Sequence, residues 1–134
     1  MNTQPYGFGI TIDLPVAQAV EQVTAALKEE GFGVLTTIDV QQTLQQKLAV
    51  AFEPYVILGA CNPQLAHRAL EAVHDIGLLL PCNVIVHTEG AQTRVEIADP
   101  QAMMRIVANP ALDRVAQEAR DRLARVLDRL KPGG

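Results

Sequence analysis

The sequence contains no serine and no tryptophan, and only 4% of its residues are aromatic. Without serine, no mechanism that uses a serine nucleophile is open to this protein. The scarcity of aromatic residues means that the hydrophobic core consists mainly of aliphatic side chains. Such a core packs well but offers few flat surfaces on which a base or another ring can stack.

A long apolar run and an excess of positive charge are also missing. No segment approaches the roughly 20 apolar residues that cross a bilayer as a helix, and the first residues lack the pattern of a secretory signal. The formal net charge is −4, whereas proteins that bind nucleic acid usually present a basic face. We therefore expect a cytoplasmic protein that binds neither membranes nor nucleic acid.

What is present suits one globular core: 134 residues, of which 49% are hydrophobic. This size is typical of a single domain, which we expect to span residues 1–134. Alternating apolar positions and one dense apolar run predict five strands, at residues 6–14, 32–38, 55–60, 78–88 and 93–97. Apolar residues at helical spacing, with capping residues before them, predict helices near residues 15–30, 40–49, 63–74 and 111–131, and a helical piece from residue 99.

These elements follow the order β-α-β-(α)-β-α-β-β-α. We expect an α+β fold of two layers, in which helices pack on one face of a mixed, mostly antiparallel sheet of about five strands. The connection through residues 63–74 is long enough to join parallel strands, and the turn at Glu89 and Gly90 joins a hairpin. The dense apolar run at 55–60 predicts a central strand that is buried on both faces.

Several features bear on the surface. The first strand places Gly7 and Gly9 on one face, which leaves that face bare. Glu29 and Glu30 have the pattern of exposed charges. The apolar stripe of the helix at 111–131 suits either an assembly seam or core packing, and we favour core packing. Because sheet edges and the bare face need covering, we expect a homodimer.

Three segments of the chain are distinctive when they are taken together. They are residues 38–44 (IDVQQTL), 55–63 (YVILGACNP, followed by Leu65 and Ala66) and 76–84 (IGLLLPCNV). With Asp99, Pro100, Met103, Asn109 and Pro110, they resemble the bacterial family known as domain of unknown function 302. The resemblance implies a compact α+β fold and a bacterial or archaeal cytoplasmic setting. It implies no established activity, so it transfers no catalytic residue or cofactor to this chain.

The two cysteines are the first candidates for chemistry. Cys61 lies just before Asn62 and Pro63, which have the pattern of a helix start. Free N–H groups and the helix dipole lower the pKa of a thiol at such a place, which would make Cys61 reactive. The alternative is that Cys61 is a small buried residue at the end of a strand, which is the commoner role of a cysteine.

Cys82 and Asn83 complete the candidate binding residues, which are Cys61, Asn62, Cys82 and Asn83. A redox pair of the two cysteines requires α-carbons within about 7 Å, and parallel strands would separate them. The helix start at Asn62 is also able to bind an anion, although ordinary capping explains it equally. His67, His74 and His87 provide no closely spaced pair of ligands, so we predict no metal site.

No catalytic constellation emerges from these residues. The first hypothesis is a non-enzymatic domain that binds a small ligand or a partner, with a second copy of the chain as the expected partner. The second hypothesis is thiol- or metal-dependent chemistry centred on Cys61.

Overall fold

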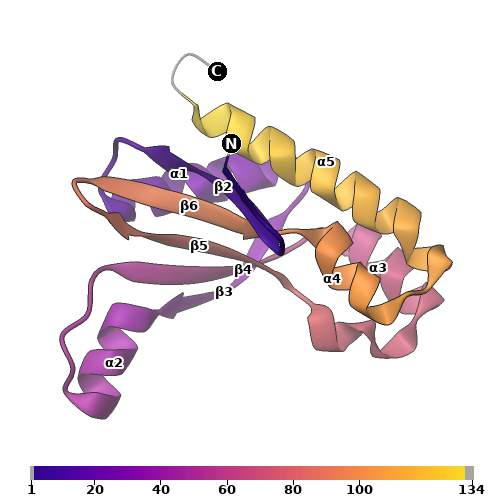
Figure 1. The fold of residues 1–134 in the computed structure, drawn as a ribbon, viewed down its shortest axis with the longest axis horizontal. Coiled ribbons are helices and arrows are strands. Elements are labelled where there is room, and N and C mark those ends of the chain that lie inside the picture. The colour runs from indigo at the N-terminus through magenta and orange to yellow at the C-terminus, as the bar shows by residue number, and fades with distance from the viewer. Residues whose placement is uncertain (1, 132–134) are drawn as a thin grey trace.

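The chain folds into a sheet and a layer of helices, as Figure 1 shows. The structure is a computed structural model that describes residues 2–131. The strands are β1 (Asn2–Gln4), β2 (Gly7–Ile12), β3 (Gly33–Asp39), β4 (Tyr55–Cys61), β5 (Cys82–Glu89) and β6 (Gln92–Ala98). The helices are α1 (Val16–Glu29), α2 (Val40–Leu48), α3 (Pro63–Ala72), α4 (Pro100–Val107) and α5 (Asp113–Leu130), with short 3-10 helices at His74–Leu79 and Pro110–Leu112.

The sheet has six strands among the described residues, in the order β1-β2-β6-β5-β4-β3. The short β1 is the strand that the sequence pattern did not predict. Every pair of neighbouring strands is antiparallel. The expected α+β fold is confirmed, but the parallel pairing around α3 is wrong. After α3, the 3-10 helix returns the chain to the end of β4 that it left, so β5 runs back alongside β4 with Ala60 opposite Cys82.

The core lies between the sheet and the helices. Alternate residues of the strands face the helices and are buried, as Phe8 and Ile10 are on β2. The apolar stripe of α5 packs onto them with Val115, Ala116, Ala119, Leu123, Val126 and Leu127. The preference for core packing over an assembly seam is therefore confirmed for this stripe. The guanidinium of Arg120 also lies over the ring of Phe8, 4.6 Å from its centroid.

The helix α2 stands apart from this layer. The helices α1, α3 and α4 contact α5, whereas the main neighbours of α2 are β3 and β4. In Figure 1 it projects away from the other helices, and none of its residues is buried. Its start was predicted correctly, because the side chain of Asp39 accepts a hydrogen bond of 2.9 Å from the backbone N–H of Gln42.

A buried carboxylate paired with two partly exposed arginines joins α1 to α5. Glu30 lies at the end of α1 and is only 5% exposed, which contradicts its expected exposure. Its carboxylate accepts hydrogen bonds of 2.9 Å from Arg125 and from Arg129. Burial by itself raises the pKa of Glu30, but the hydrogen bonds and charges of Arg129 and Arg125 outweigh it, so the pKa lies below its ordinary value.

The first prediction concerns this cluster. Replacing Glu30 by glutamine removes the charge between two arginines, so we expect the free energy of unfolding to fall by about 1–3 kcal/mol. Urea denaturation at pH 7 measures the loss. The matched control is Glu29→Gln, because Glu29 is the exposed neighbour and its replacement should change the free energy of unfolding by less than about 0.5 kcal/mol.

The stability that Glu30 contributes should also depend on pH in a definite direction. Because the pKa of Glu30 is lower in the folded state, its contribution to stability is present above its ordinary pKa of 4.5 and is lost as the pH falls through the folded value. The wild type should therefore lose more stability on acidification than Glu30→Gln. Equal losses in the two proteins would contradict a structural role for the cluster.

Candidate functional site

The four residues that the sequence singled out lie at the junction of β4, α3 and β5. Cys61 ends β4, and Asn62 caps α3 by accepting a hydrogen bond of 3.2 Å from the backbone N–H of Leu65. Because Ala60 pairs with Cys82, Cys61 is one residue beyond that pair. The antiparallel register therefore brings the two cysteines together, which the predicted parallel strands would have prevented.

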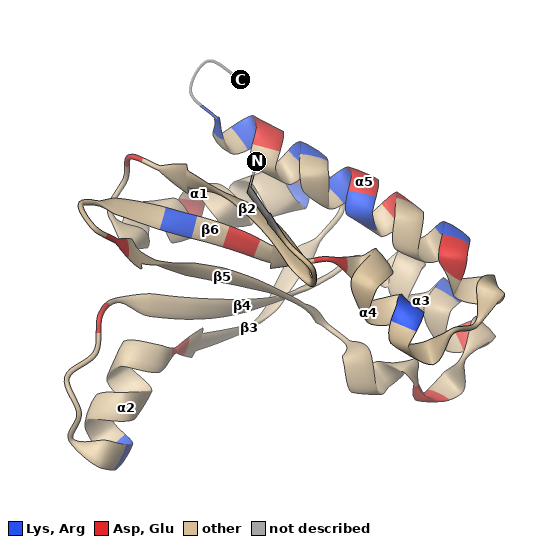
Figure 2. Ribbon diagram, in the orientation of Figure 1, with Lys and Arg blue, Asp and Glu red and all other residues tan. Residues whose placement is uncertain are grey.

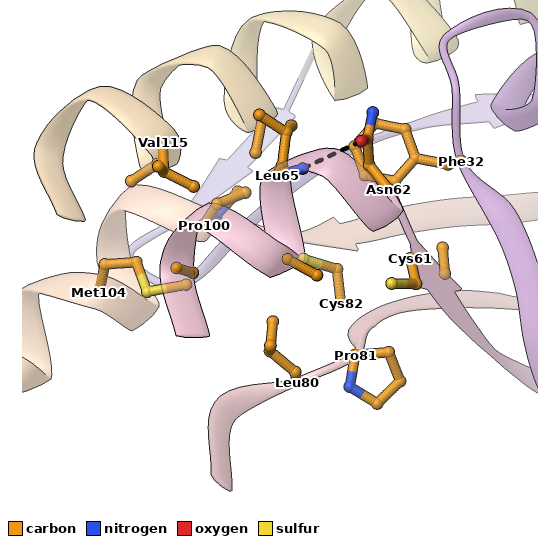
Figure 3. A pocket seen from close by; sticks show the side chains of 15 residues that line it. Phe32, Cys61, Asn62, Leu65, Leu80, Pro81, Cys82, Pro100, Met104 and Val115 are labelled. Carbon is orange, nitrogen blue, oxygen red and sulfur yellow. Dashed lines mark hydrogen bonds between the residues drawn. The ribbon is translucent and has the colours of Figure 1, made fainter. Parts of the chain in front are cut away.

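A small apolar cavity occupies this junction, shown in Figure 3. Cys61, Asn62 and Cys82 line it, whereas Asn83 does not. The cavity has a volume of about 30 Å³, which is the space of about one water molecule. The other lining residues are Phe32, Ala60, Leu65, Ala66, Ala69, Leu80, Pro81, Pro100, Met104, Val115, Ala116 and Ala119.

Burial governs the chemistry of the two thiols. Both cysteines are free. Burial raises the pKa of Cys61, and burial together with the nearby Cys61 thiol raises the pKa of Cys82 to about 11. The helix start therefore does not leave a thiol of lowered pKa at Cys61, and the N–H group of Leu65 is already bonded to Asn62.

The histidines lie apart from the cysteines. His67 pairs with Glu71 at 3.0 Å on the exposed side of α3. His87 lies on β5, where its ring stacks on Tyr55 with 5.0 Å between the ring centroids. In the described part of the chain, no three histidine, cysteine or acidic side chains gather in a way that could hold a metal ion.

The face of the sheet that the helices leave uncovered is the larger unexpected feature. We call it the open face. Its residues alternate with those that face the helices, and the registers place them in three rows across the sheet. One row is Thr11, Arg94, His87 and Tyr55; the next is Gly9, Glu96, Ile85, Ile57 and Ile38; the third is Gly7, Ala98, Asn83, Gly59 and Thr36.

The open face is apolar near its middle. Ile57 and Ile85 are only half-buried, and Ile38 is 47% exposed. The prediction that the strand at 55–60 is buried on both faces is therefore wrong for the face that holds Ile57. The sequence contained a signal for this exposed apolar surface. The strand at 55–60 has apolar residues on both of its faces, whereas the expected two-layer fold has helices on only one face of the sheet.

Two expectations about the open face need correction or refinement. The face is not bare at Gly9, because the side chain of Glu96 folds over it: a β-carbon at Gly9 would lie 2.7 Å from Cγ of Glu96. Asn83 faces this side of the sheet, where it helps to line a groove together with Ile85 and Ala98. It is therefore separated from Cys61, Asn62 and Cys82.

A second, larger groove lies beside the start of α1, and we call it the α1 groove. It runs between α1, the β5–β6 turn and the junction of β3 with α2. Its volume is about 760 Å³, within the range of sites for small organic molecules. Its lining residues are Leu14, Pro15, Val16, Ala17, Val20, Glu21, Thr37, Asp39, Gln41, Pro54, Tyr55, Val56, Thr88, Gly90, Ala91, Gln92 and Thr93.

Comparisons with known proteins agree with this architecture. The family model of DUF302, a domain of unknown function, matches residues 8–130. A crystal structure of an uncharacterized conserved DUF302 protein from Bacillus stearothermophilus superposes with a TM-score of 0.88 at 34% sequence identity, covering 94% of this chain and 98% of that chain. No curated protein matches. The chain belongs to the DUF302 family, as the segments around Cys61 and Cys82 indicated.

The second prediction concerns the thiols. Since the pKa of Cys82 is raised to about 11 from its ordinary value of 9.0, its thiolate fraction at pH 8 is about a hundredfold below that of an ordinary thiol. We expect iodoacetamide to alkylate Cys82 far more slowly in the native protein than in urea, with a rate that rises up to pH 10. The Cys61→Ala variant isolates Cys82, and Cys82→Ala isolates Cys61. Alkylation of Cys61 at pH 7 that is faster in the native than in the denatured protein would contradict this account.

Proposed function

We propose that this DUF302 protein is a non-enzymatic module that binds a small ligand in the α1 groove. The observation that carries the proposal is the groove itself, which has a volume of about 760 Å³. The cavity between the cysteines has a volume of about 30 Å³ and accommodates no organic molecule of ordinary size.

The lining of the α1 groove combines apolar walls with polar groups at its edge. Leu14, Val16 and Val20 come from the start of α1, and Val56 comes from β4. All four are partly buried and pack against the core. Hydroxyl and amide groups of Thr37, Thr88, Gln41 and Gln92 supply hydrogen-bonding partners. This combination of apolar walls and a few polar groups is typical of sites that bind small molecules.

The charge of the lining indicates the class of ligand. Glu21 and Asp39 are the charged residues of the lining, and it includes no lysine, arginine or histidine. A carboxylate or phosphate would meet like charge there without a compensating cation. The groove therefore favours an apolar molecule that is neutral or carries a positive charge.

The alternative, chemistry centred on Cys61, has less support. Burial raises the pKa of both Cys61 and Cys82, so neither thiol is activated as a nucleophile. Within the described residues, no helix is both long and apolar enough to span a membrane.

The third prediction tests the groove and its charge together. The probes are octyltrimethylammonium, octanol and octyl sulfate, which share a chain length and differ in charge. Titrations followed by two-dimensional NMR of the backbone amides should show shifts at Val16, Val20 and Thr37 with the first two probes. We expect the cation to bind about tenfold more tightly than the anion, because two acidic groups face it.

Two matched variants test whether Asp39 and Glu21 cause the preference for the cation. Asp39→Asn retains the helix cap, because asparagine caps as well as aspartate does, and Glu21→Gln keeps the shape of an exposed residue. The double variant should lose the preference for the cation and keep its affinity for octanol. Shifts that lie outside the α1 groove, or an equal affinity for the cation and the anion in the wild type, would contradict the proposal.

A further inference from the structure

Residues 40–52, which we call the arm, form an ordered projection with an apolar surface. The exposed side chains include Leu48 at 65%, Val50 at 45% and Phe52 at 42%. Hydrogen bonds and capping residues hold the arm in a defined conformation. Asp39 caps the start of α2, Ala49 ends it in the left-handed conformation, with φ 54°, and the side chain of Gln41 donates a hydrogen bond of 2.9 Å to the backbone oxygen of Phe52.

The open face is the second unpartnered surface. An antiparallel sheet that has one face in water normally places polar residues on that face. Here Ile38, Ile57 and Ile85 neighbour one another across three strands and form an apolar row that runs from the edge strand β3 to β5. Within the described chain, no helix of the core layer covers the arm or the open face, and the arm touches the face only at its base, where the ring centroids of Phe52 and Tyr55 are 6.1 Å apart.

The accessible surface of the molecule is larger than a monomer of this size requires. The chain exposes 7737 Å². A compact monomer of 14.5 kDa exposes roughly 6,900 Å² according to the usual scaling, which leaves an excess of roughly 850 Å². A standard interface between two proteins buries about 800 Å² on each partner. This difference is similar to the area that one partner buries in a standard interface, and it reflects the projecting arm and the uncovered face of the sheet.

The distribution of charge favours a contact between the arm and the open face. Lys47 is the charged residue of the arm, as Figure 2 shows for α2. On the open face, Glu89 and Glu96 accompany the cation Arg94, and Glu53 lies where the arm meets this face, 3.9 Å from the ring of His87. Each copy carries a formal net charge of −4, so two copies repel one another in most orientations. An arm placed on an open face brings the cation Lys47 toward an acidic surface.

We propose that the occupant of the open face is a second copy of this chain, with the arm of each copy lying on the open face of the other. The arrangement is twofold and isologous, so that one contact made twice covers both unpartnered surfaces. This inference does not require a ligand in the α1 groove. Val56 and Thr93 of that groove point to the side of the sheet opposite the open face, whereas Tyr55 and Gln41 belong both to the groove and to the proposed interface.

The fourth prediction tests the pairing. Size-exclusion chromatography with light scattering, over a range of concentrations, should give the wild type about twice the chain mass of 14.5 kDa. Leu48→Asp on the arm and Ile38→Asp on the open face should each raise the dissociation constant of the dimer by at least about thirtyfold. Both side chains are substantially exposed in the single chain, at 65% and 47%, so the variants should fold; circular dichroism checks this.

The matched control is Leu78→Asp. Leu78 is 86% exposed and belongs to the 3-10 helix after α3, at the far end of the molecule from the arm (Figure 1). It should leave the mass and the dissociation constant unchanged. A monomeric wild type at about 100 μM would overturn the proposal. So would a dimer that persists in Leu48→Asp, because this outcome places the interface elsewhere, for example along the edge of β3.

Discussion

A sheet has two faces, and this chain has helices for one of them. The helices α1, α3, α4 and α5 close one face with a continuous apolar core. The other face carries half-exposed isoleucines and the stacked rings of Tyr55 and His87 beside polar residues such as Arg94 and Glu96. Burial of apolar area is the largest favourable contribution to folding and association, so an uncovered apolar face largely determines which interactions are open to the protein.

The segment between β3 and β4 belongs to both the arm and the α1 groove. This segment leaves the sheet as the arm rather than joining the helix layer, so it leaves the start of α1 uncovered and forms one wall of the α1 groove. Asp39 lies where the two features meet, because it caps α2 and also lines the groove. At the opposite end of α1, Glu30 fixes that helix to α5 through Arg125 and Arg129. The groove is therefore bounded by one anchored helix and one projecting arm.

Most of the fold followed from local patterns in the sequence. Alternation along the strands and the capping residues Asp39, Asn62 and Asp99 placed the elements, because these signals act over a few residues. The pairing of β4 with β5 did not follow, since a connection of this length permits either direction and the 3-10 helix at His74–Leu79 decides it. The burial of Glu30 depends on Arg125 and Arg129, which lie far along the chain, so its local sequence indicated only an exposed charge.

Of the candidate site, the sequence indicated Cys61, Asn62 and Cys82, and these residues do line one cavity. The α1 groove could not be predicted, because four separate segments form it and no single motif connects them.

In the proposed dimer, the arm of a second copy covers the open face. The most direct measurement is an isotope-filtered NMR experiment on a mixture in which one copy carries labelled leucine methyl groups and the other carries labelled isoleucine methyl groups. If the arm of one copy lies on the open face of the other, intermolecular NOEs should join Leu48 of one copy to Ile57 or Ile85 of the other. Their absence at concentrations where light scattering reports a dimer would contradict the claim, because it would show that the two copies meet through another surface.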